Sequence, residues 1–95
     1  MTTVHTVVGN TIRNRAMMAN ALCAVAEQEV HTGRLLEARE TVRTVRALLA
    51  EVSIILSGDT SYLPYGTLRE TSELLAGLDE KIGQVERALG SQTIH

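Results

Sequence analysis

Apolar residues, with one threonine among them, recur in steps of three and four along two long stretches of the chain. They are Leu35, Ala38, Val42, Val45, Leu49, Val52 and Leu56 in the first stretch, and Leu68, Thr71, Leu75, Leu78, Ile82, Val85 and Leu89 in the second. This alternation keeps one side of an α-helix apolar over its whole length, as the a and d positions of a heptad do. Each stretch is therefore predicted to form a helix that packs against others along its length.

A looser repeat of the same kind precedes them. It comprises Val4, Val8, Ile12, Ala16, Ala19, Leu22, Ala26 and Val30. Gly9 is expected to weaken this helix near its start, because glycine has low helix propensity. Turn-forming residues fall at 32–33 and 57–66, which predicts helices over about 3–31, 34–57 and 67–89. Short connections make consecutive helices antiparallel, so the sequence predicts an all-α, antiparallel three-helix bundle in a single domain, residues 1–95.

Residues at the predicted helix ends support these boundaries. Gly33 and Gly58 stand where a helix often ends on a left-handed residue, which glycine adopts without a steric penalty. Thr67 and Glu70 have the spacing of a capping box, which predicts that the third helix starts at Thr67.

Charged residues beside the two regular repeats indicate how these helices pair. If Leu56 lies near Leu68 in an antiparallel pair, Arg39 is placed opposite Glu86 and Arg46 opposite Asp79. The halves of the chain differ in the same sense: residues 1–46 contain six arginines and four glutamates, whereas 47–95 contain three basic and seven acidic residues. We expect these charges to pair internally and to select the register.

The opposite edge of the same pair is apolar and is expected to be covered. Leu48, Ile55 and Leu74 lie on it, and the alanines of the first helix allow a close approach there. Cys23, Met17 and Met18 are interpreted as side chains that fill gaps in the core.

The composition narrows the classes of function. The chain has 95 residues, a net charge of −2, one cysteine and no apolar run near the 18 or so residues that a membrane span needs. The small net charge favours neither nucleic acid nor a membrane as a partner, and a single cysteine favours a reducing, cytoplasmic location.

The residues typical of catalysis or metal binding do not form a recognisable set. Glu27 and His31 are four residues apart, but metal sites in helical bundles take such pairs from more than one helix. Glu37 with Glu40, and Glu70 with Glu73, have a Glu-x-x-Glu spacing that resembles the Mg²⁺-binding helices of all-α pyrophosphatases, which leaves a metal-dependent nucleotide hydrolase as an alternative. We predict that the protein is not an enzyme, with no catalytic residue, cofactor or metal.

One segment has an unusual composition. The chain has no Phe and no Trp, and both of its tyrosines lie between the second and third helices, in the segment from Ser57 to Gly66. Leu63 and one tyrosine are expected to close the end of the core. A contact surface for a protein partner is the alternative for this region, and its candidate residues are Ile54, Tyr62, Leu63 and Tyr65.

The function predicted from these patterns is protein binding. We expect a small helical regulator, inhibitor or chaperone-like accessory protein that acts by contact. A homodimeric helical accessory protein, of the kind found in mobile elements or phages, is the alternative.

Overall fold

The computed structural model consists of three long helices. Helix α1 spans Thr2–His31, α2 spans Leu35–Leu56 and α3 spans Tyr65–Thr93. The structure describes residues 2–58, 61, 63 and 65–93, and the side chains of 9–58, 61, 63 and 65–91. No strand occurs in these residues, and all three pairs of helices are in contact, which confirms the predicted all-α three-helix bundle.

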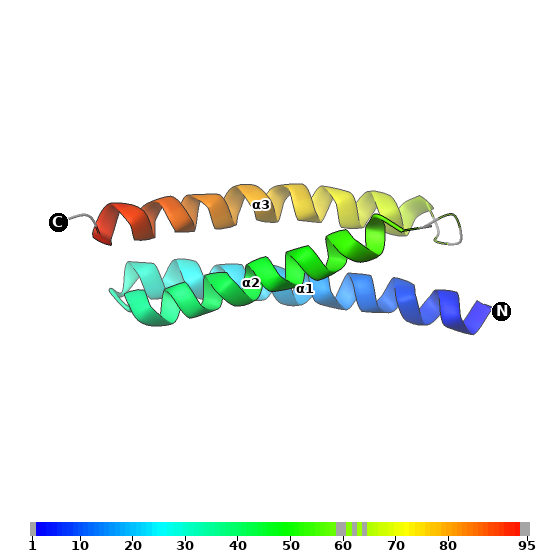
Figure 1. The fold of residues 1–95 in the computed structure, drawn as a ribbon, viewed down its shortest axis with the longest axis horizontal. Helices are drawn as coiled ribbons and strands as arrows, with labels where there is room; N and C mark the ends of the chain where they lie inside the picture. Colours follow the sequence, from blue (N-terminus) through cyan, green and yellow to red (C-terminus); the bar gives the residue numbers. More distant parts are fainter. Residues whose placement is uncertain (1, 59–60, 62, 64, 94–95) are drawn as a thin grey trace.

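The helices lie antiparallel in sequence order and form a rod. Its Cα atoms extend over 55 × 17 × 17 Å, and the connection between α2 and α3 lies at the same end as the start of α1 (Figure 1). We call this end, with residues 57–64 and the adjoining helix ends, the loop end. In the described part of the chain, no helix has both the length and the apolar character required to cross a membrane.

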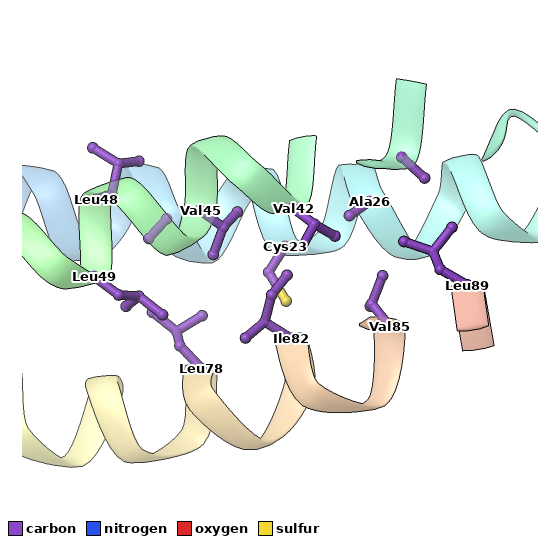
Figure 2. Close-up of a cluster of buried hydrophobic side chains, with 12 residues drawn as sticks. Cys23, Ala26, Val42, Val45, Leu48, Leu49, Leu78, Ile82, Val85 and Leu89 are labelled. Atoms are coloured by element: carbon purple, nitrogen blue, oxygen red, sulfur yellow. The ribbon is translucent and has the colours of Figure 1, made fainter. Parts of the chain in front are cut away.

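The heptad positions form the core, as predicted. Every apolar position of the two regular repeats is buried or half-buried, and Thr71 is buried with them. The main cluster draws on all three helices (Figure 2); its buried members are Ala19, Cys23, Ala26, Ala38, Val42, Val45, Leu48, Leu49, Leu78, Ile82, Val85 and Leu89. On α1, Cys23 is buried whereas Leu22 is only half-buried, so the repeat of the first helix runs through Cys23.

Small side chains bring α1 and α2 closest together. Ala19 and Ala26 on α1 and Ala38 on α2 are fully buried, and this pair of helices has the most extensive backbone proximity of the three. Helices α2 and α3 approach each other least closely, because leucine and isoleucine side chains fill the space between α3 and the other two (Figure 2). Leu48 is buried and Ile55 and Leu74 are half-buried, so α1 covers this edge as expected.

The helix boundaries confirm one predicted glycine signal and correct the other. Gly33 has φ +79°; its N–H donates to the Val30 carbonyl and that of Arg34 to the Glu29 carbonyl, which is the Schellman pattern. Gly58 is not left-handed: α2 ends at Leu56, its C-cap Ser57 has a right-handed conformation, and the Ser57 hydroxyl donates to the Ile54 carbonyl. Helix α1 continues through Gly9 without interruption.

The start of α3 also differs from the prediction. The helix begins at Tyr65, so Thr67 is its third residue and does not occupy the N-cap position. The capping box predicted from Thr67 and Glu70 is therefore wrong.

The charge register is confirmed for one of the two predicted pairs. Arg46 Nη1 lies 2.8 Å from Asp79 Oδ1, and the same guanidinium also donates to both carboxylate oxygens of Glu86. Asp79 and Glu86 are seven residues apart and so lie on one face of α3, where a single arginine can reach both. Glu86 therefore pairs with Arg46 and not with Arg39, which has no ion pair among the described residues. The predicted Arg39–Glu86 pair is wrong.

Candidate functional site

The candidate contact residues come from the loop end. Ile54 precedes the last residue of α2 by two positions, and Tyr65 is the first residue of α3. The antiparallel course of the two helices brings these positions to one end of the rod (Figure 1). Tyr62 and the neighbouring Pro64 lie outside the described residues.

Leu63 closes the end of the core, as expected. Its side chain is 6% exposed and forms a small cluster with Ile12 of α1 and Val52 of α2. It also lies over α1 at Gly9, where an added Cβ would be 3.7 Å from Leu63 Cδ2. Leu63 is therefore part of the core and is not an accessible contact residue.

Ile54 and Tyr65 have the opposite environment. They are 71% and 78% exposed, respectively. Ile54 is exposed because Val52 and Ile55, on either side of it in sequence, take the positions that face the core. We call Ile54 and Tyr65 the loop-end surface; the buried Leu63 anchors the connection between them.

The exposed neighbours of this surface are small residues together with one charge on each helix. Ser53, Ser57, Gly58 and Gly66 are exposed and lie within four residues of Ile54 or Tyr65. Glu51 and Arg69 are also exposed, about one helical turn from Ile54 and Tyr65 respectively. A partner that covers Ile54 and Tyr65 therefore meets one acidic and one basic group at the edge of the contact.

Cys23 is a core residue and not a nucleophile. It is 1% exposed and its sulfur points among the core side chains between α1 and α3 (Figure 2). Burial, with a further contribution from the negative charge of Glu27, raises the pKa of the thiol above its ordinary value. Because the thiolate is the reactive form, this environment keeps Cys23 unreactive at neutral pH.

Glu27 and His31 line a shallow hollow between α1 and α3. The hollow has a volume of about 270 Å³, and Lys81 and Gln84 of α3 lie on its other side. The positive charge of Lys81 beside His31 opposes the binding of a cation there. No group of three metal-ligating side chains occurs anywhere within the described residues.

The two Glu-x-x-Glu pairs lie far apart. Glu37 and Glu40 are in the first turns of α2 and Glu70 and Glu73 in the first turns of α3, which the antiparallel arrangement places at opposite ends of the rod (Figure 1). Glu40, Glu70 and Glu73 are each within 4 Å of an arginine, namely Arg43, Arg13 and Arg69. The four carboxylates therefore do not converge on a shared metal site of the pyrophosphatase kind.

The arginines of α2 form a stripe whose charge is largely paired. Arg43 lies 3.2 Å from Glu40, and Arg46 bonds to two carboxylates of α3. The bond to Glu86, and then that to Asp79, raise the pKa of the Arg46 guanidinium above its ordinary value.

Exposed methionines are the feature that the sequence interpretation missed. Met17 and Met18 do not fill the core: both side chains are exposed, and Met17 lines a hollow between α1 and α3 with Thr71 and Leu74. The sequence contained a signal for this exposure. Ala16 and Ala19 belong to the apolar repeat, and Met17 and Met18 between them point about 100° or more away from both alanines around the helix axis.

Comparison of the chain with protein-family models, with curated proteins and with solved structures found no match.

Proposed function

We propose that this protein acts by binding another protein through the loop-end surface, as a regulator, inhibitor or chaperone-like accessory protein. The observation that supports the proposal is the difference in burial among the candidate residues at the loop end. Of the described candidate residues, Leu63 is buried as part of the core, whereas the Ile54 and Tyr65 side chains remain in solvent.

The two side chains suit a contact surface in chemistry and in placement. A tyrosine offers a large, rigid area with a hydroxyl at its edge, and tyrosines are enriched among residues that dominate binding energy. Ile54 and Tyr65 belong to helices, so their backbones are already ordered before binding. Less of the binding free energy is therefore spent on ordering this surface than on ordering a flexible loop.

The partner that fits this surface presents an apolar pocket for the Tyr65 ring, with a hydrogen-bonding group for its hydroxyl and an aliphatic contact for Ile54. The rim of the contact includes the exposed Glu51 and Arg69, about one helical turn from Ile54 and Tyr65 respectively, besides serines and glycines. A reducing, cytoplasmic compartment accords with the single cysteine, which stays a buried thiol.

The test is affinity capture with variants of the surface. The bait carries Ile54→Glu with Tyr65→Ala, and the matched control is Leu36→Glu. Leu36 lies on the same outer face of α2 at the opposite end and is equally exposed. We expect one protein to be captured in stoichiometric amount by the wild type and by the control, and to be lost from the double variant.

Circular dichroism must show that the double variant remains folded, as expected for two exposed positions. Equal capture by all three baits would place the binding surface elsewhere on the molecule. Capture of no protein by the wild type would contradict the proposed function itself.

A further inference from the structure

Helix α1 has an outer face without a single charge. The face consists of Asn10, Asn14, Met17, Met18, Ala21, Ala24, Val25 and Gln28, all of them exposed, within about one third of the helix circumference. Its largest apolar side chains, Met17, Met18 and Val25, are 58%, 49% and 46% exposed. From Asn10 to Gln28 the face is about 27 Å long at the usual helical rise.

The other two helices show what a solvated face looks like in this protein. The outer face of α2 carries Glu40, Arg43 and Glu51, and that of α3 carries Arg69, Glu73, Glu80 and Arg87, all exposed. A helix that meets only water normally bears charge on the side away from the core. The outer face of α1 departs from this rule along five turns.

The charges of α1 lie instead on the two edges of this face, and they are ordered along the helix. Arg13 and Glu27 lie on one edge, and Arg15 and Glu29 on the other. On both edges the arginine precedes Ala21 and the glutamate follows it, so the face is basic at its start and acidic at its end.

From this pattern we infer that the outer face of α1 binds a second copy of the same chain, with the two α1 helices antiparallel about a two-fold axis at Ala21. Under this symmetry an edge meets the same edge of the second copy, reversed in direction. Arg13 then lies opposite Glu27 of the second copy, and Arg15 opposite its Glu29. The midpoints of these two pairs are residues 20 and 22, which bracket the axis.

The apolar side chains fit the same axis. Met17 and Val25 are each four residues from Ala21, so Met17 lies at the same level of the interface as Val25 of the second copy. Met18 and Ala24 are each three residues away, so a large side chain of one copy shares a level with a small side chain of the other. Alanines at 21 and 24 let the two helices approach closely at the centre, and methionine adapts its shape to the space that remains.

The edge arginines retain the capacity for these pairs. Arg13 Nη2 lies 3.8 Å from Glu70, and Arg15 Nε lies 3.5 Å from Glu51 without a hydrogen bond; both arginine side chains are substantially exposed. A guanidinium has five N–H donors, so each can serve a second carboxylate. A parallel pair of α1 helices would place arginine beside arginine and glutamate beside glutamate, which selects the antiparallel arrangement.

The first test measures the mass of the protein by sedimentation equilibrium at micromolar concentrations. The wild type is expected to be a dimer. Ala21→Arg places two like charges on the axis and should raise the dimer dissociation constant at least about 100-fold. The matched control, Ala47→Arg, changes an exposed alanine on the outer face of α2 and should leave the constant within about two-fold. Ile54→Glu at the loop end should also leave it unchanged, so this test is independent of the proposed partner surface.

The second test checks direction by exchange of charge. Arg13→Glu and Glu27→Arg should each weaken the dimer about 5- to 10-fold, because two symmetric pairs are lost. The two changes in one chain should restore the wild-type constant to within about three-fold. Circular dichroism of every variant should show an unchanged helical content, since all these positions are exposed.

A wild-type monomer up to about 100 μM would overturn the inference, as would a dimer that Ala21→Arg leaves intact. Failure of the charge exchange to restore association would overturn the antiparallel register. A different protein bound at this face of a monomeric chain would overturn the choice of a second copy as its occupant.

Discussion

Replacement of Leu63 by alanine tests whether the α2–α3 connection is part of the core. Leu63 is 6% exposed and packs with Ile12 and Val52, which are fully buried. Burial of a leucine side chain is worth about 1.5–3 kcal/mol, and the cavity left by its removal adds to the loss. A cluster at the end of the bundle can relax more than its centre, so we expect Leu63→Ala to lower the free energy of unfolding by about 2–3 kcal/mol.

The matched control for this substitution is Leu36→Ala. It removes the same atoms from a side chain that is 74% exposed, and it should change the stability by less than about 0.5 kcal/mol. Urea unfolding followed by circular dichroism at 222 nm measures both variants. For a chain of this size the expected loss corresponds to a fall in Tm of roughly 10–20 °C.

Equal stability of the two variants would refute the assignment of Leu63 to the core. If Leu63→Ala and Leu36→Ala differ by less than about 0.5 kcal/mol, the end cluster does not contribute to folding, and Leu63 is free to act as a contact residue after all.

Three further predictions concern single features of the bundle. A double-mutant cycle on Arg46→Ala and Asp79→Ala should give a coupling of about 0.2–1 kcal/mol, because the pair is exposed to solvent; zero coupling would contradict the α2–α3 register. Cys23→Ala should retain function and lower the free energy of unfolding by about 1–2 kcal/mol. Because burial raises the pKa of the thiol, the part of the stability that depends on the protonated thiol should be present below about pH 8.5 and be lost as the pH rises toward the raised pKa. A difference in stability between wild type and Cys23→Ala that grows with pH would contradict this. Thermal denaturation should show Gly77→Ala, in an open mid-helix position, stabilised by about 0.5–1 kcal/mol and Gly33→Ala, at φ +79°, destabilised by a similar amount; the opposite order would contradict the assigned helix end.

The heptad positions predicted the fold because the burial of their apolar side chains makes the dominant contribution to folding. Residues such as Val45 and Ile82 are fully buried, and apolar burial at a helical period leaves few alternatives to packed helices. The helix ends were predicted less well because several residues can start or stop a helix at similar cost. Thr67 has capping spacing, yet the helix begins two residues earlier, at Tyr65.

Side-chain pairing and exposure were predictable only in part. The repeat gave the Arg46–Asp79 pair, but a long arginine side chain can choose between carboxylates one heptad apart, and Arg46 bonds to Glu86 as well. The candidate contact residues proved to be partly buried and partly exposed, which the sequence could not show for a geometric reason. A leucine in the connection and a tyrosine two positions later, at the start of α3, follow no periodicity that shows which one faces the core; in the folded protein Leu63 is buried and Tyr65 is exposed.

The two proposals together imply a molecule with two binding ends. The start of α1 lies at the loop end, so antiparallel contact at Ala21 would place the two loop-end surfaces at opposite ends of the dimer (Figure 1). Such a dimer could hold two copies of a partner, with an apparent affinity raised by bivalency wherever both are fixed to one assembly.

Site-specific photo-crosslinking in cells that produce the protein tests directly whether Tyr65 contacts another protein. A photoreactive phenylalanine derivative replaces Tyr65 in one sample and Leu36 in another, both exposed, and the crosslinked products are identified by mass spectrometry. We expect one dominant adduct from position 65, with a protein other than this chain, and no such adduct from position 36. The same adducts from both positions, or none from position 65, would contradict this expectation.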